Sequence, residues 1–126
     1  MKKIILTEKA PAAIGPYSQA VEANGFLFIS GQLPVVPATK EMPDDIKTQT
    51  KQALENVGAI LNAAGYSFEH VIKSTVLLSD IKDFAAMNEV YSEYYRHDCP
   101  ARVAYQVAAL PLGAKIEIET IAFKNC

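Results

Sequence analysis

The 126-residue chain predicts an α+β fold in which two helices cover one face of a mixed β-sheet. Three features support this prediction. Two segments carry apolar residues at helical spacing, several shorter segments have the apolar and β-branched composition of strands, and Asn, Gly and Pro separate them. The predicted order is β-β-β-α-β-α-β-β. With this length and 50% apolar residues, we expect a single domain spanning residues 1–126.

Three strands are predicted in the N-terminal part of the chain. They cover Ile4 to Leu6, Tyr17 to Val21 and Phe26 to Ser30. Asn24-Gly25 joins the second strand to the third, because both residues accept the positive φ of a tight hairpin turn. The Pro-rich stretches 11–16 and 34–43 are expected to be loops, since proline lacks the amide donor that a central strand needs.

The first helix is predicted from Ile46 to Ala64. Asp44 or Asp45 can cap its start, and Gly65 suits the left-handed conformation after its end. Its apolar stripe is assigned to the core and comprises Ile46, Ala53, Leu54, Val57, Ile60, Leu61 and Ala64. Asp83 is expected to cap a second helix, whose apolar face comprises Phe84, Met87, Tyr91 and Tyr94.

A strand from Val71 to Leu78 lies between the helices, and two more strands are expected between Pro100 and Phe123. If Leu112 and Gly113 formed the turn of an antiparallel pair, Arg102 would lie opposite Phe123 and Glu117 opposite Ala108. Six strand positions, roughly 20 Å, would then separate the two charges. They could not pair within one subunit, so either they have different partners or they meet across an interface.

Several predicted strands are apolar on both faces, and two helices can cover only one. The segments are Ile4 to Leu6, Phe26 to Ile29 and Val76 to Leu78. A second copy of the chain is the natural cover for the other face, so we predict a closed homo-oligomer.

Arg102 is the only charged residue between Pro100 and Lys115. A buried charge without a partner costs several kcal/mol, so a guanidinium in an apolar strand needs an anion. Two interpretations remain open. The anion is a protein carboxylate in a structural salt bridge, or it is a small carboxylate ligand, which the two-pronged donor geometry of Arg can bind and that of Lys cannot.

Composition argues against several classes of function. The net charge of −2 and the lack of a Lys/Arg run disfavour nucleic-acid binding. No apolar run is long enough to span a membrane, and the N-terminal apolar stretch is too short for a secretory signal, so we expect it to belong to the fold. Cys99 and Cys126 suggest a reducing cytoplasm. His70 and His97 are far apart in sequence and are expected to be solvated, which leaves no metal site.

Four motifs resemble the Rid family, the reactive intermediate deaminases formerly called YjgF, and in particular its RidA subgroup. They are GPYSQA (Gly15 to Ala20), ISGQLP (Ile29 to Pro34), PARVAYQVAALP (Pro100 to Pro111) and IEIE (Ile116 to Glu119). The resemblance covers essentially the whole chain at unbroken spacing. A Pro-Ala-Arg run followed by Ile-Glu-Ile is far more specific than a lone arginine.

The resemblance implies a chorismate-mutase-like fold assembled as a homotrimer with ligand clefts between subunits. The implied enzyme is a cytoplasmic 2-iminobutanoate/2-iminopropanoate deaminase. It would hydrolyse small 2-imino acids, or enamines such as 2-aminoacrylate, to 2-keto acids and ammonia, and so protect pyridoxal-phosphate enzymes. It would need no metal or organic cofactor, and no nucleic-acid or membrane partner is expected. Two alternatives are a non-catalytic regulator that binds small carboxylates and an RNA-cleaving translation inhibitor.

On matching positions, the resemblance implies catalytic roles for Arg102, Glu117 and Tyr17. Substrate binding would fall to Arg102, Ser30, Gly31, Asn88 and Ala104. Many relatives carry a cysteine where this chain has Ala104, so a thiol nucleophile is not available there and only backbone contacts remain. Each side chain also has a plainer interpretation: a solvent-facing carboxylate for Glu117, a packing residue for Tyr17, a turn for Gly31 and a helix-surface amide for Asn88.

Overall fold

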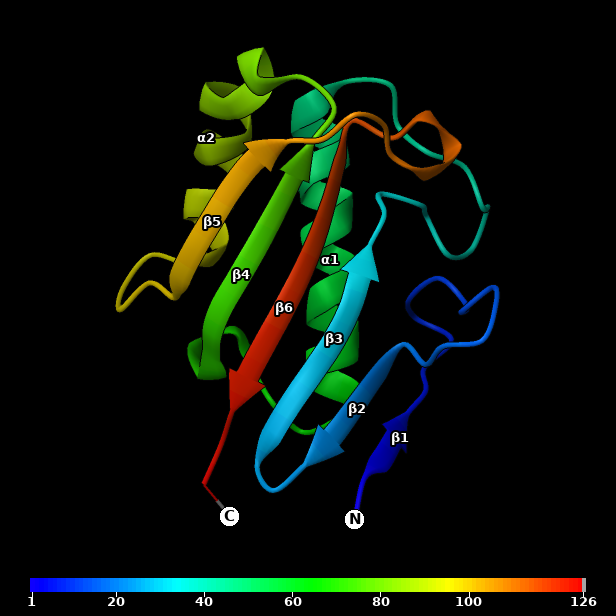
Figure 1. Ribbon diagram of the computed structural model, residues 1–126, viewed down its shortest axis with the longest axis vertical. Helices are drawn as coiled ribbons and strands as arrows, with labels where there is room; N and C mark the ends of the chain where they lie inside the picture. The colour runs from blue at the N-terminus through cyan, green and yellow to red at the C-terminus, as the bar shows by residue number, and fades with distance from the viewer. Residues whose placement is uncertain (126) are drawn as a thin grey trace.

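The computed structural model describes residues 1–125 and shows two layers, a six-stranded sheet and two helices packed on one of its faces (Figure 1). The elements follow the predicted order. The strands are β1 (Lys3–Ile5), β2 (Ala20–Ala23), β3 (Phe26–Gln32), β4 (Val71–Leu78), β5 (Ala101–Gln106) and β6 (Ile116–Phe123). The helices are α1 (Ile46–Ala63) and α2 (Phe84–Tyr94), and three short 3-10 turns complete the chain.

The strands are arranged in the order β1-β2-β3-β6-β4-β5. All neighbouring strands are antiparallel except β4 and β5, which are parallel. The predicted hairpin between the last two strands is therefore wrong. Leu112 and Gly113 do turn the chain, each with positive φ, but the connection carries β6 past β5 to a place between β3 and β4. There β6 has a neighbouring strand on each side, and its apolar residues Ile116 and Ile118 are fully buried.

Most local predictions are confirmed. Asn24 and Gly25 have φ values of 55° and 87° at the hairpin turn. Asp45 caps α1 by accepting a hydrogen bond from the Thr48 amide at 3.1 Å, and Gly65 adopts positive φ after the helix.

Two local predictions are wrong. Residues 17–19 belong to a loop, and β2 starts only at Ala20, because buried Gln19 holds the loop through its side chain. Asp83 occupies the N-cap position of α2, but its side chain makes no capping bond. Asp80 instead caps the preceding 3-10 turn, accepting from the Lys82 amide at 2.9 Å.

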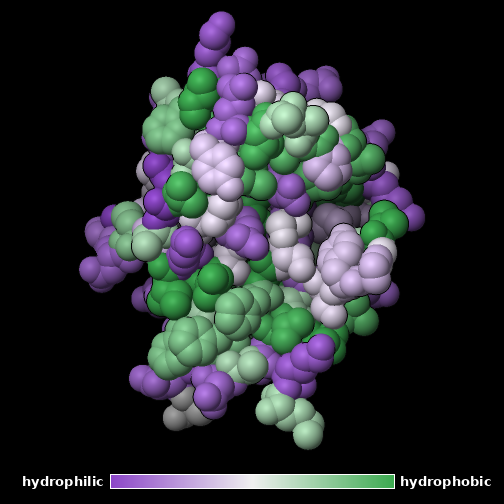
Figure 2. Space-filling model, viewed as in Figure 1, coloured by the Kyte–Doolittle hydropathy of each residue, from purple (hydrophilic) through white to green (hydrophobic). Residues whose placement is uncertain are grey.

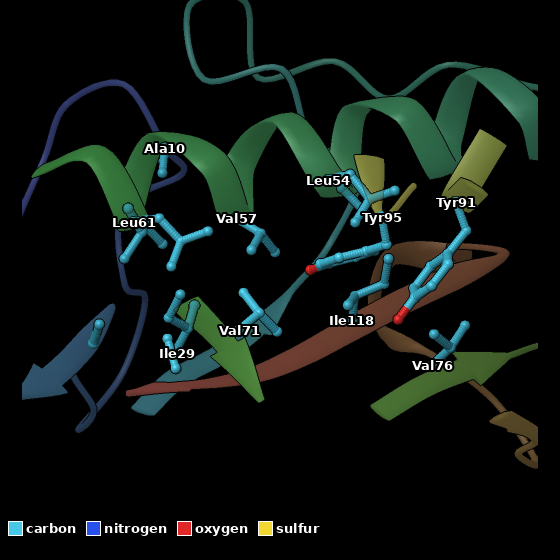
Figure 3. Packing of buried hydrophobic residues seen from close by; sticks show 14 of the residues in the cluster. Ala10, Ile29, Leu54, Val57, Leu61, Val71, Val76, Tyr91, Tyr95 and Ile118 are labelled. Atoms are coloured by element: carbon cyan, nitrogen blue, oxygen red, sulfur yellow. The ribbon is translucent and has the colours of Figure 1, made fainter. Parts of the chain in front are cut away.

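The hydrophobic core lies between the helices and the sheet (Figure 3). The predicted stripe of α1 packs against alternate residues of the central strands. The fully buried residues of the core include Leu54, Val57 and Ile60 from α1. They face Ile29, Val76 and Ile118 from the sheet. No helix within residues 1–125 is both long and apolar enough to cross a membrane. Cys126, one of the two thiols used to predict a reducing compartment, lies outside the described residues.

The opposite face of the sheet carries no helix (Figure 1) and exposes many hydrophobic side chains (Figure 2). Ile4, Phe28, Val103 and Tyr105 are each 42–51% exposed, and they come from three different strands, β1, β3 and β5. These residues explain why the sequences of the strands are apolar on both faces. The open face (the sheet surface that carries these four residues) is the surface on which the prediction of a homo-oligomer depends.

Candidate active site

Arg102 lies on β5, opposite Ser74 of β4, and its side chain is on the helix-covered side of the sheet. Its Nη1 donates a 2.7 Å hydrogen bond to Oδ1 of Asn88 on α2. The guanidinium carbon lies 4.8 Å from the centre of the Tyr91 ring and 5.5 Å from that of Phe84. We call Phe84, Asn88, Tyr91 and Arg102 the arginine cluster.

The surroundings of Arg102 differ from the prediction in one respect. Because β5 is an edge strand, Arg102 is exposed in the single chain and is not buried in an apolar strand. No carboxylate within residues 1–125 forms an ion pair with it, so an intrachain salt bridge does not explain it. One of its five N–H donors binds Asn88, and the others remain available for a planar anion.

Glu117 lies on β6 with its side chain on the open face. Burial of the carboxyl, and to a smaller extent the neighbouring charge of Glu119, raises the pKa of Glu117 above its ordinary value. A carboxyl with a raised pKa is a better proton acceptor when it is ionised, which suits general base catalysis.

Gly31 leaves the space that the Glu117 side chain occupies. A Cβ atom added at residue 31 would clash with Oε2 of Glu117 and lie 2.9 Å from its Cδ. Gly31 sits where the pairing of β3 with β6 shifts register, next to Ser30. The structure therefore brings Ser30, Gly31 and Glu117 together, and we call these three residues the glutamate cluster.

Tyr17 and Ser30 are linked through the loop that precedes β2. The Ser30 hydroxyl donates a 2.6 Å hydrogen bond to the Ser18 carbonyl, and the Ser30 amide donates to the Gln19 carbonyl at 2.9 Å. Tyr17, next in the chain to Ser18, is 54% exposed. Its hydroxyl accepts from the Ile14 amide at 3.3 Å, which leaves its own proton free to donate.

The two clusters do not meet within one chain. Arg102 shares a row of the sheet with Ser74, whereas Glu117 shares a row with Leu77, three residues further along β4. Two strand spacings and three residues place the Cα atoms of Arg102 and Glu117 roughly 14 Å apart. The two side chains also point to opposite faces. The expectation that they cannot pair within a subunit therefore holds, although the predicted hairpin geometry does not.

Ala104 lies two residues after Arg102 on the same strand and packs against the core beside Val76. Its methyl group is partly buried and offers no nucleophile. The structure thus places Ala104 next to the arginine cluster, with only its backbone available for polar contacts.

Two features of the site have no counterpart in the sequence analysis. Phe84 and Tyr91 were assigned to the core only, yet with Asn88 they form the i, i+4, i+7 stripe that faces Arg102, a spacing that could have revealed them. Gln19 orders the loop beside the glutamate cluster. It accepts from the Thr7 amide at 2.8 Å and donates to the Pro11 carbonyl at 2.8 Å, and no sequence signal indicates this role.

The fold and the two clusters define a small α+β protein with an arginine suited to binding a carboxylate and a separate carboxyl suited to acid–base chemistry. Residues 7–124 match the family model described as Endoribonuclease L-PSP. The chain belongs to this family, the Rid or YjgF family that its motifs resemble.

The chain is similar along its whole length to proteins of several organisms. A RutC family protein of Pyrococcus horikoshii is 59% identical over 126 residues, covering 99% of this chain and 100% of that protein. The 2-iminobutanoate/2-iminopropanoate deaminase of Capra hircus is 55% identical, covering 99% and 92%. The crystal structure of E. coli TdcF with bound serine superposes with a TM-score of 0.94 at 48% identity, covering 98% and 99%.

Proposed function

We propose that this protein hydrolyses small 2-imino acids and their enamine tautomers, such as 2-aminoacrylate and 2-iminobutyrate, to 2-keto acids and ammonia. The observation that carries the proposal is an arginine that has no carboxylate partner among residues 1–125, held with several donors free on one edge of the sheet. The names of relatives that are 50–55% identical over nearly the full chain support it. So does a structural neighbour crystallised with serine, a small amino acid that carries a carboxylate.

In the proposed reaction, Arg102 binds the substrate carboxylate through a charge-assisted pair that contributes roughly 1.5–3 kcal/mol. Asn88 and the backbone beside Ala104 complete this half of the site. Fixing the carboxylate places the imine carbon in one position relative to the attacking water. No metal and no organic cofactor takes part.

Glu117 acts on the water. It accepts a proton as the water oxygen bonds to the carbon of the protonated imine, whose nitrogen becomes an amine. Glu117 returns this proton to the nitrogen, and the carbon–nitrogen bond breaks as the new hydroxyl group gives up its proton, which releases ammonia and leaves the keto group. The Tyr17 hydroxyl donates to the water or to the imine nitrogen, and Ser30 and Gly31 keep Glu117 and the adjoining loop in place.

Because the two clusters lie far apart in one chain, the proposed site forms between copies. The glutamate cluster of one subunit faces the arginine cluster of its neighbour, in a closed homotrimer that also covers the open face. In the cell, the proposed role is the removal of reactive imines and enamines in the cytoplasm before they damage pyridoxal-phosphate enzymes.

A coupled assay tests the activity. Threonine dehydratase generates 2-iminobutyrate in a buffer that hydrolyses it slowly, and formation of the 2-keto acid is followed. Wild-type protein should accelerate this step. Arg102→Ala should lose nearly all of the gain, and Arg102→Lys most of it, because an ammonium cannot form the two parallel hydrogen bonds. Equal rates with and without protein would refute the enzyme and leave a non-catalytic carboxylate-binding regulator.

The description of the family model also raises RNA cleavage as a candidate activity. Phosphate contacts dominate affinity for nucleic acids, and a chain with a net charge of −2 is poorly suited to supply them. Binding of RNA with a steep salt dependence would reverse this ranking.

A further inference from the structure

Tyr91 is a buried residue whose ring lies against the proposed carboxylate-binding arginine. It is 6% exposed, and its ring packs against Tyr95 with 4.7 Å between ring centres. Figure 3 shows the side chain extending from α2 toward Val76 on the sheet. A ring held in this way has little freedom to change its rotamer.

The guanidinium of Arg102 rests on this ring. The 4.8 Å from its carbon to the Tyr91 ring centre is within the range for a cation–π contact, and shorter than the 5.5 Å to Phe84. The Asn88 bond alone would leave the guanidinium free to swing about one contact. A fixed ring and one hydrogen bond together define both its plane and its direction.

Other groups around Tyr91 fit this arrangement. Burial raises the pKa of the Tyr91 hydroxyl, while the Ser74 side chain and the charge of Arg102 act to lower it. The hydroxyl therefore stays protonated and neutral near pH 7, so that the ring face is what Arg102 meets. No carboxylate within residues 1–125 competes for the guanidinium.

We infer that Tyr91 is a positioning residue for Arg102: its ring holds the guanidinium in the orientation that presents the remaining N–H donors to a substrate carboxylate. This inference rests on the proposed function and adds to it a residue that does not itself contact the substrate. The aromatic ring is the required feature, and the hydroxyl group is not.

Binding of the product 2-oxobutanoate, titrated on purified protein, tests the inference. Tyr91→Leu should raise its dissociation constant about two- to five-fold, the effect of losing one cation–π contact at an exposed site. Tyr91→Phe should restore wild-type binding. Tyr94→Leu is the matched control on the same helix, because Tyr94 binds Glu55 and does not contact Arg102.

A second readout does not depend on binding or catalysis. In wild-type protein, ring-current shielding should move the guanidinium NMR signals of Arg102, assigned by their loss in Arg102→Lys, upfield of their ordinary positions. Tyr91→Leu should reduce this shift to the part that Phe84 contributes, and Tyr91→Phe should keep it in full. If Tyr91→Leu fails to fold, Phe84→Leu decides instead, because most of the shift should remain through the shorter contact with Tyr91.

The outcomes separate the two ideas. Arg102 signals at ordinary positions in wild-type protein, or unchanged in folded Tyr91→Leu, would overturn the role of Tyr91. Equal affinity of wild type and Arg102→Ala for 2-oxobutanoate would instead refute Arg102 as the carboxylate ligand, while the NMR shift would still report on Tyr91.

Discussion

Gly31→Ala isolates the contact between Gly31 and Glu117. The new Cβ would lie 2.9 Å from Cδ of Glu117, whereas ordinary contacts begin at 3.4 Å. The backbone at residue 31 has no positive φ, so alanine is sterically acceptable to the main chain. The substitution therefore acts on the Glu117 carboxyl group, which must move by at least about 0.5 Å at Cδ and further at Oε2.

The expected effects on activity and stability are very different. A misplacement of about 1 Å can cost 100-fold in rate, so we expect kcat/KM to fall roughly 10- to 100-fold. Each tenfold loss corresponds to about 1.4 kcal/mol of transition-state stabilisation. The free energy of unfolding should change by less than about 1 kcal/mol, because alanine favours a strand over glycine by about 0.5–1 kcal/mol and the displaced carboxylate is flexible.

The coupled dehydratase assay measures the first effect and urea unfolding the second. Gly58→Ala, in α1, is the matched control, since its Cβ would meet only the Phe68 ring and the site is untouched. If Gly31→Ala kept wild-type kcat/KM, the Glu117 carboxylate would not need its observed position. The proposed role of Glu117 in orienting water would then be wrong.

Two further predictions concern single side chains. The proposed activity needs ionised Glu117, so it should fall as the pH drops through the raised pKa of this carboxyl group. Glu119→Gln should move the acidic limb of the pH–rate profile to lower pH, because a nearby negative charge is removed. An unmoved limb would contradict this prediction. Thr120 and Thr50 are both buried, but the Thr120 hydroxyl has no hydrogen-bond partner within residues 1–125, whereas Thr50 donates to the Ile46 carbonyl at 2.7 Å. In urea unfolding, Thr120→Val should therefore be neutral or stabilising and Thr50→Val should cost about 1 kcal/mol; the reverse order would contradict the assignment.

Local sequence signals predicted most of the fold. Helical periodicity, the Asp45 cap and the Asn24-Gly25 turn depend on neighbours within a few residues, and all three are confirmed. The pairing of β5 was not predictable in the same way. Because β6 lies between β3 and β4, β5 pairs with β4, and Arg102 therefore lies opposite Ser74. Which strand takes the central position depends on which one gains more from burial across the whole sheet.

The same limit applies to the site. Motif resemblance selected Arg102 and Asn88, and the structure brings them into contact. The expectation of a buried guanidinium came from the apolar composition of the strand, which does not reveal that β5 lies at the edge of the sheet. Gln19 shows the opposite case. Its buried amide fastens the loop between β1 and β2 and has no short-range pattern, because its partners at Thr7 and Pro11 become neighbours only in the folded chain.

Mixing two inactive variants tests whether the site is shared between copies. Arg102→Ala chains keep Glu117, and Glu117→Gln chains keep Arg102, so a site with both groups forms only where the two kinds of chain are neighbours in the right order. In a random equal mixture, the copy that supplies the arginine cluster to a site carries Arg102 with a probability of one half. The neighbouring copy carries Glu117 with the same probability. About a quarter of the sites should then be active, if the copies form a closed ring.

Co-expression or joint refolding followed by the coupled assay measures this recovery. Each variant alone should stay inactive, and so should the two variants assembled separately and mixed afterwards without exchange. Two clusters roughly 14 Å apart on opposite faces of one sheet cannot act on one small molecule, so recovery is a requirement of the proposed mechanism. Its complete absence in verified mixed oligomers would mean that the arginine and glutamate clusters do not form a common site.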